Sequence, residues 1–327
     1  MRFFPAFCLL FLFFVGCTDS MNVADTIAEQ PPYDKLTDSI RMSPKNPELY
    51  YHRGSLFYHN NQLLHAEHDL RTAWQLNPTE QYALSLTTIL KQKNSDSAIS
   101  FLKAALAKLP ESISLQIGLA RGYQQKNQLQ QALAICDNIL KKYPDQIDAL
   151  LLKSEILKQQ NKIAEALTLK EAAFSYAPGD VELGYDLAYD FAEAKNKKAL
   201  RLTDLLLRSD STENAAKAFY VKATYYANTG NATDAIANYN AAIRKDYNFL
   251  DAYLDKGELL HKQSKYKEAL QVFELGQRIS PSTAEFYFAI AKTQEAMGNK
   301  KDAKANYQKA YGLNKSMTEA KQAADKL

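Results

Sequence analysis

Alanine recurs along this chain at an almost constant interval of 34 residues. Steps of 32, 34, 34, 33, 36, 34 and 34 residues separate eight marker alanines: Ala66, Ala98, Ala132, Ala166, Ala199, Ala235, Ala269 and Ala303. A period of roughly 20 to 50 residues is typical of an array in which each structural unit contacts only its neighbours. The period therefore predicts about eight repeated units that share a linear core.

Each repeat has the pattern of two helices joined by a turn. In the sixth repeat, Ala235, Tyr239 and Ala242 lie at spacings of four and three residues, which places them on one stripe of a helix. Gly230 and Asn231 stand before this helix, and residues of this kind end one helix and turn the chain. Five repeats close with a proline, which cannot continue a helix: Pro78, Pro110, Pro144, Pro178 and Pro281. The pattern predicts an all-α chain of helical hairpins.

The small, aromatic and proline positions that recur at this period resemble the tetratricopeptide repeat, over residues 47–317. The resemblance implies a right-handed superhelical solenoid of about eight helical hairpins. We expect residues 32–46 to form an N-terminal capping helix and residues 318–327 a C-terminal one. The second and fifth repeats depart from the pattern, because the second lacks a glycine turn and the fifth lacks a closing proline.

The first residues of the chain predict export. Residues 1–16, MRFFPAFCLLFLFFVG, place Arg2 before an apolar run shorter than the roughly 20 residues of a membrane-spanning helix. Cys17 resembles the lipidated cysteine of bacterial lipoproteins, although Phe14 stands where their motif usually has leucine. The resemblance implies a lipid on Cys17, a flexible tether over residues 17–31, and attachment to the outer membrane on its periplasmic side or at the cell surface. Ordinary cleavage and an uncleaved anchor are the alternatives.

Charge and motifs argue against nucleic-acid binding and catalysis. The formal net charge of +3 is too small to create the field that attracts nucleic acid. The chain has no glycine-rich phosphate loop and no GxSxG, HExxH or CxxC motif, so we expect neither an enzyme nor a cofactor. Four histidines of the first repeat are either metal ligands or exposed polar residues: His52, His59, His65 and His68. We favour exposure, because these histidines divide between two helices.

In an array of this family, the first helices of the hairpins line a concave groove. The family places the fifth and ninth positions of these helices in the groove, which makes the following residues candidates for partner binding: Tyr51, Arg121, Tyr185, Tyr189, Tyr220, Leu254 and Phe288. Tyr185, Tyr189 and Tyr220 would form an aromatic patch of the kind that anchors interfaces. The alternative is that these tyrosines pack between the repeats.

The combined prediction is a membrane-tethered scaffold that holds a protein or peptide partner in its groove. The resemblance to lipid-anchored members of the family suggests a role in envelope assembly, in a pilus or in secretion machinery. The alternative is a lipoprotein that binds a carbohydrate or small ligand for nutrient uptake, and a hydrolase or transferase is a third class without candidate residues. The junction at residues 208–215, RSDSTENA, lacks a proline, so we predict that it is the softest joint of the array and flexes beside Tyr189 and Tyr220.

Overall fold

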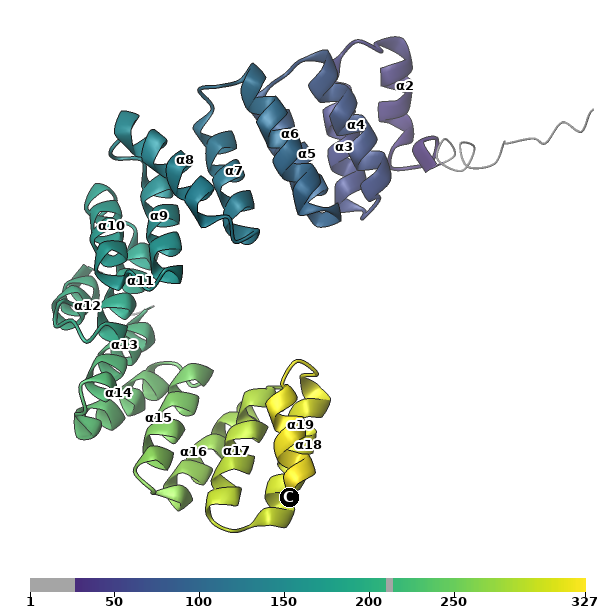
Figure 1. Ribbon diagram of the computed structural model, residues 1–327. Coiled ribbons are helices and arrows are strands. Elements are labelled where there is room, and N and C mark those ends of the chain that lie inside the picture. Colours follow the sequence, from purple (N-terminus) through teal and green to yellow (C-terminus); the bar gives the residue numbers. More distant parts are fainter. Residues whose placement is uncertain (1–26, 210–213) are drawn as a thin grey trace, which may run out of the picture. The chain divides into compact units, whose positions relative to one another are not determined.

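The computed structural model describes residues 27–209 and 214–327, and this part of the chain is all-helical with no strand (Figure 1). First and second helices of successive hairpins alternate along it, as the repeat pattern predicts. The chain divides into two compact units, one ending at Pro144 and the other running from Asp145 to Leu327. None of the described helices combines the length and the apolar character that a membrane span requires.

The unit that ends at Pro144, here the first unit, holds a leading helix and three hairpins. Its helices are α2 (Asp34–Met42), α3 (Pro47–His59), α4 (Leu63–Leu76), α5 (Glu80–Lys93), α6 (Ser95–Lys108), α7 (Ile113–Gln125) and α8 (Leu129–Lys142). The second unit holds five hairpins and a closing helix. Its helices are α9 (Ile147–Gln159), α10 (Ile163–Tyr176), α11 (Val181–Glu193), α12 (Lys198–Ser209), α13 (Ala215–Asn228), α14 (Ala232–Lys245), α15 (Leu250–Lys262), α16 (Tyr266–Ile279), α17 (Ala284–Ala296), α18 (Lys300–Leu313) and α19 (Thr318–Lys326).

The marker alanines are the points of closest packing. All eight are buried, and each lies on the second helix of its hairpin. A small side chain at this place lets the neighbouring backbone approach, and the larger residue four positions later fills the space beside it. Tyr239, for example, is buried beside Ala235 and Ala223 in one cluster. The predicted spacing of small and aromatic residues therefore determines where the two helices of a hairpin pack most closely.

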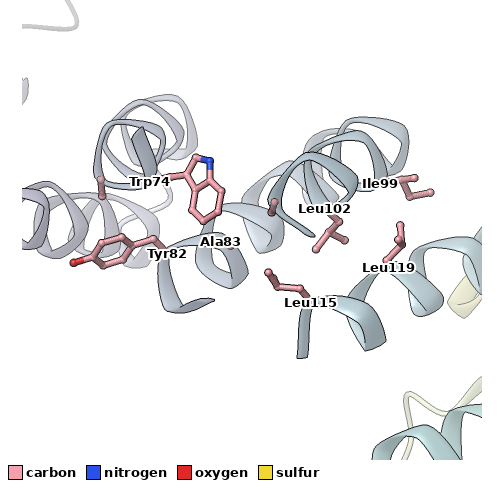
Figure 2. Packing of buried hydrophobic residues seen from close by; sticks show 9 residues of the cluster. Trp74, Tyr82, Ala83, Ile99, Leu102, Leu115 and Leu119 are labelled. Carbon is pink, nitrogen blue, oxygen red and sulfur yellow. The ribbon is translucent and has the colours of Figure 1, made fainter. Parts of the chain in front are cut away.

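Hydrophobic clusters extend from one hairpin into the next. In the first unit, Trp74 of α4, Tyr82 of α5, Leu102 of α6 and Leu115 of α7 belong to one buried cluster (Figure 2). Each hairpin thus supplies one wall of a core whose other wall comes from the next hairpin. The fold is that of a helical repeat solenoid, as the period predicts.

A residue in the left-handed region closes most turns inside the hairpins. Gly230 has φ 83° and Asn127 has φ 57°, and both residue types tolerate this region better than others do. The second hairpin is different, because only Asn94 separates α5 from α6. The Asn94 side chain accepts a hydrogen bond of 2.8 Å from the backbone N–H of Asp96. This shortened turn accounts for the 32-residue step between the first two marker alanines.

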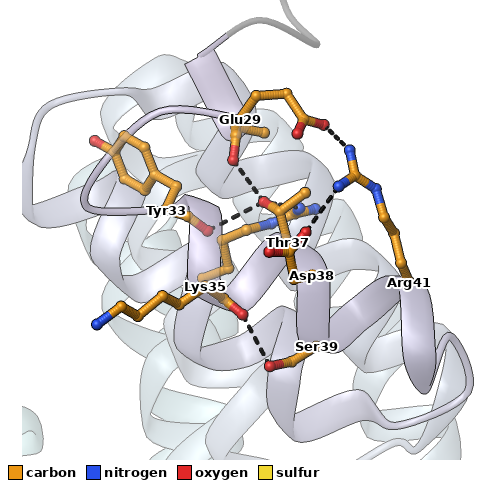
Figure 3. A network of polar contacts seen from close by, with 9 residues as sticks. Glu29, Tyr33, Lys35, Thr37, Asp38, Ser39 and Arg41 are labelled. Carbon is orange, nitrogen blue, oxygen red and sulfur yellow. Dashed lines mark hydrogen bonds and ion pairs between the residues drawn. The ribbon is translucent and has the colours of Figure 1, made fainter.

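Polar contacts tie the leading helix α2 to the first hairpin, and a second network joins Thr37 and Arg41 of α2 to residues 28 and 29 just before it (Figure 3). Arg53 of α3 donates to both carboxylate oxygens of Asp69, at 2.7 and 2.9 Å, and also to the Thr37 hydroxyl of α2 at 2.9 Å. The Asp69 side chain is only 2% exposed, so the Arg53–Asp69 ion pair is shielded from water. At the outer face of α2, Arg41 pairs with Glu29. These contacts cover the end of the repeat core.

Candidate functional site

Two tyrosines of the second unit stack against each other on neighbouring first helices. Tyr189 lies on α11 and Tyr220 on α13, with ring centroids 6.0 Å apart and ring planes 6° from parallel. Both side chains are half-buried. Tyr220 also approaches Phe249 and Tyr239, at centroid distances of 5.0 and 6.0 Å. The stacked pair therefore lies partly between repeats and partly open to solvent.

A carboxylate of the next repeat holds the hydroxyl of Tyr220 in place. The Tyr220 hydroxyl donates a hydrogen bond to Oδ2 of Asp255 on α15, 2.7 Å away and 35 residues along the chain. Burial, and then the charge of Asp255, raise the pKa of Tyr220 far above its ordinary value. The phenol consequently stays protonated and keeps donating. A ring held at its hydroxyl loses little further freedom when a ligand stacks on it.

Carboxylates surround the stacked tyrosines. Burial raises the pKa of Tyr189, and the charges of Glu193, Asp255 and Asp251 raise it further. Burial also raises the pKa of Asp255, against the lowering effect of the hydrogen bond from Tyr220, and neighbouring carboxylates add to the rise. Glu193 accepts a hydrogen bond of 2.9 Å from the side-chain amide of Asn228. The environment of the pair is thus both aromatic and negatively charged.

A cavity of about 330 Å³ lies among α15, α17 and α19. Leu254 and Phe288 contribute apolar walls, and Asp255 lines the cavity while it bonds to Tyr220. The other charged residues of the lining are Glu258, Glu285, Glu319, Lys262 and Lys292. Two of the predicted groove residues, Leu254 and Phe288, are thus brought together at a recess that can accept an apolar side chain.

His261 of α15 also lines this cavity. The Thr293 hydroxyl donates to the Ala289 carbonyl at 2.8 Å, so it accepts from Nδ1 of His261 at 3.0 Å. Burial and the nearby Lys292 lower the pKa of His261, which favours the neutral ring with its proton on Nδ1. The sequence prediction did not include His261, because this histidine stands apart from the cluster of four in the first repeat.

A half-buried lysine marks a second feature that the sequence prediction missed. Lys170 of α10 and Lys158 of α9 each donate to Asp190 of α11 at 2.6 Å. Lys158 and Asp190 line a cavity of about 350 Å³ together with Tyr189 and Glu193. The sequence contained a signal for this ion pair. Lys170 occupies the position four after the marker alanine, where most repeats have an apolar or aromatic residue.

The structure corrects the prediction for Tyr185. Its side chain is only 1% exposed and packs in a cluster with Leu206 of α12 and Ala218 of α13. The small Ala218 leaves room for the ring, and Lys217 covers it with Nζ 5.9 Å from the ring centroid. Tyr185 therefore belongs to the core, and the prediction that it joins Tyr189 in an exposed patch is wrong.

The remaining groove candidates, Tyr51 and Arg121, lie on α3 and α7 of the first unit. Both are half-buried. The ring centroids of Tyr51 and of Tyr82 on α5 are 5.1 Å apart. Tyr51 therefore contacts the next repeat. Tyr51 thus has the same kind of inter-repeat aromatic contact as Tyr189.

Three of the four histidines of the first repeat are exposed on the helix surface, and His65 is half-buried. His52, His59 and His68 are exposed, and Nδ1 of His59 donates to the backbone oxygen of Ser55 at 2.7 Å. The ring of His65 packs 5.0 Å from that of Phe57. Within residues 27–209 and 214–327, no three side chains of His, Cys, Asp or Glu converge to hold a metal ion.

Two sequence predictions fall outside the described residues, in whole or in part. Residues 1–16, with the predicted signal, and the lipid-attachment candidate Cys17 lie outside them, as does the tether up to residue 26. The junction predicted to flex, residues 208–215, includes residues 210–213, which are also outside. Both predictions therefore stand on the sequence alone.

Comparison with known families agrees with this architecture. Family models described as tetratricopeptide repeats match residues 90–156, 220–284 and 284–317. The chain belongs to the tetratricopeptide repeat family. Arrays of this family are generally binding scaffolds for other proteins, and the first helices that carry Tyr189 and Tyr220 are the elements with which such arrays present a binding surface.

Curated proteins and solved structures are similar to this chain over part or most of its length. A DnaJ homolog subfamily C member 7 homolog from Dictyostelium discoideum is 23% identical over 285 residues, which cover 82% of this chain and 51% of the relative. The chain therefore spans about half the length of that relative. A tetratricopeptide repeat protein from Parabacteroides merdae has a TM-score of 0.59 at 20% identity, over 75% of this chain and 97% of the other. The C-terminal part of a repeat protein from Cytophaga hutchinsonii has a TM-score of 0.50 at 16% identity, over 74% and 98%. These two structures share the fold.

Proposed function

We propose that this protein is a membrane-anchored scaffold that holds a protein partner against the first helices of its repeats. The observation that carries the proposal is the stacked pair of Tyr189 and Tyr220, held by Asp255 beside a cavity walled by Leu254 and Phe288. Half-buried aromatic side chains next to an apolar recess are the features with which interfaces anchor a partner's side chains. In the described residues, this site lies wholly inside the second unit.

The anchoring part of the proposal rests on the amino-terminal sequence. An apolar run after Arg2, followed by Cys17, supports export and lipid attachment, with the repeats at the outer membrane on its periplasmic side or at the cell surface. A scaffold in that place would serve envelope assembly, a pilus or secretion machinery. Partner binding and anchoring are separable properties, because they depend on different residues.

Site-specific photo-crosslinking in the native cell tests partner binding. A photoreactive amino acid replaces Phe288 in the cavity wall, and in a matched control it replaces Tyr176, which is 52% exposed on the second helix α10. We expect a discrete crosslinked protein from position 288 and none from position 176. Equal crosslinking from both positions, or none from position 288 under several growth conditions, would contradict the proposal. Saturable binding of oligosaccharides without any protein crosslink would favour the nutrient-uptake alternative.

A further inference from the structure

The structure assigns a partner chemistry to the site in the second unit. We propose that the surface formed by Tyr189, Tyr220, Asp251, Asp255 and Glu258, here called the acidic groove, binds a basic peptide segment. A lysine or arginine side chain of the peptide lies against the stacked tyrosines, and a neighbouring apolar side chain enters the adjoining cavity. This inference rests on the proposed scaffold function and specifies its partner.

The first argument is the charge balance of the carboxylates in the acidic groove. Four carboxylates elsewhere in the second unit are neutralised by lysines of the same chain: Asp190 by Lys158 and Lys170, Glu171 by Lys198, Glu182 by Lys217, and Asp204 by Lys222. In the acidic groove, no lysine or arginine of the described residues forms an ion pair with Asp251, Asp255 or Glu258. The groove therefore keeps a negative charge that a partner can neutralise.

The second argument is the repulsion among these carboxylates. Burial, together with the charges of Glu258, Asp251 and Glu193, raises the pKa of Asp255, although the Tyr220 hydrogen bond acts against it. A cation placed here would relieve this repulsion, and an anion would increase it. Lys262 and Lys292 line the adjoining cavity, where the carboxylates Asp255, Glu258, Glu285 and Glu319 outnumber them. Charge complementarity thus favours a basic partner over an acidic one.

The third argument is the half-buried aromatic surface of Tyr189 and Tyr220. Lysines of this chain lie over several of its own tyrosine rings, such as Lys315 over Tyr311 at 4.5 Å from the ring centroid. Among the described residues, no lysine or arginine occupies such a position over Tyr189 or Tyr220. Aromatic rings flanked by carboxylates attract a cationic head group by both the ring quadrupole and the charge. This combination is specific to lysine and arginine among peptide side chains.

The cavity explains why a peptide fits better than a free cation. Asp255 both lines the cavity and holds Tyr220, so the charged and the apolar parts of the site are continuous. A polyamine could satisfy the carboxylates but would leave the recess at Leu254 and Phe288 unfilled. A peptide with basic and apolar residues in turn satisfies both parts.

Fluorescence anisotropy with labelled synthetic peptides tests the inference on the full repeat array. The probes are three peptides of equal length that alternate leucine with lysine, with serine or with glutamate. We expect saturable binding of the lysine peptide that weakens with added salt, and no binding of the glutamate peptide. Binding of the glutamate peptide as tightly as the lysine peptide would overturn the inference, as would displacement of the lysine peptide by equimolar spermidine.

Paired charge variants locate the binding surface. In D251N/E258Q, two exposed groove carboxylates lose their charge; in the control E165Q/E274Q, two exposed carboxylates of the second helices α10 and α16 lose theirs. We expect the first variant to bind the lysine peptide about fivefold more weakly and the control to bind as the wild type does. Equal weakening in both variants would overturn the inference.

The outcome separates this inference from the proposed function. If photo-crosslinking at Phe288 recovers a partner whose capture does not change in D251N/E258Q, the scaffold stands and the basic-peptide inference is wrong. If crosslinking recovers no partner and the lysine peptide does not bind, both are wrong. Loss of the partner in D251N/E258Q but not in E165Q/E274Q is the result that we expect.

Discussion

Asp190 shows how a single residue can join two repeats. Its carboxylate accepts hydrogen bonds from Lys158 and Lys170 of the preceding hairpin, and its side chain is 13% exposed. Burial alone would raise the pKa of Asp190, but the two lysines lower it below its ordinary value of 3.8. A carboxyl group whose pKa is lower in the folded state stabilises the fold above its unfolded pKa. That stabilisation is lost as the pH falls through the folded pKa.

The variant D190N should therefore be less stable at neutral pH. We expect a loss of about 1 to 3 kcal/mol in the free energy of unfolding at pH 7, because Lys170 then remains in a half-buried place without a charged partner. The difference from the wild type should start to shrink below about pH 4, where the carboxyl of the unfolded chain is protonated, and should vanish as the pH falls through the lower pKa of the folded state. Urea unfolding at several pH values measures the loss of stability at pH 7 and its decrease at low pH. The control is D186N, since Asp186 is exposed on the same helix α11; an equal loss in D186N would contradict the argument.

At the scale of the helices, close approach depends on particular small residues. Gly257 of α15 faces Phe273 of α16, and a Cβ at Gly257 would lie 2.3 Å from Cε1 of that ring. Phe273 is buried and cannot rotate into solvent. The same relation recurs between Gly276 and Phe286, where the distance would be 2.2 Å. These contacts set how closely α15, α16 and α17 pack.

The variant G257A should consequently destabilise the second unit, although alanine is the better helix former. We expect a loss of about 1 to 3 kcal/mol from overpacking against the Phe273 ring. The matched control is G312A on α18, because a Cβ at Gly312 would meet no atom within 4 Å. This control should gain up to about 1 kcal/mol from helix propensity. Thermal or urea unfolding of both variants gives the comparison; stabilisation of G257A would refute the packing argument.

At the scale of the whole molecule, polar contacts recur at about one repeat of separation. Tyr220 bonds to Asp255 over 35 residues, and His261 bonds to Thr293 over 32. Stability in such an array is close to a sum of repeat and interface terms, so a change at one interface acts mainly on its own neighbours. Cys17 precedes the first repeat in the sequence, so we expect a change there to leave these interfaces intact.

The variant C17S should therefore separate anchoring from folding. We expect it to lose lipid attachment, because serine offers no thiol, while the circular dichroism and unfolding midpoint of the array stay unchanged. Metabolic labelling with a fatty-acid analogue checks the first part. Label that persists in C17S, or that never appears in the wild type, would show that Cys17 is not the attachment site.

The sequence by itself determined the number of hairpins, the places of their helices and the buried marker alanines. These features follow from the four-residue and seven-residue spacings within a helix and from the 34-residue period, and each depends on residues close together in one hairpin or in the next. The same spacing also placed Tyr189 and Tyr220 on neighbouring first helices.

Only the tertiary structure decided which of these side chains face solvent and which atoms meet across repeats. The ring of Tyr185 is buried because the small Ala218 of another hairpin leaves room for it, and Asp255 bonds to Tyr220 because α15 brings its carboxylate to the hydroxyl. The pairing of Lys170 with Asp190 arises in the same way. Such contacts depend on the size and direction of side chains from two different repeats, and the spacing within one helix carries no information about them.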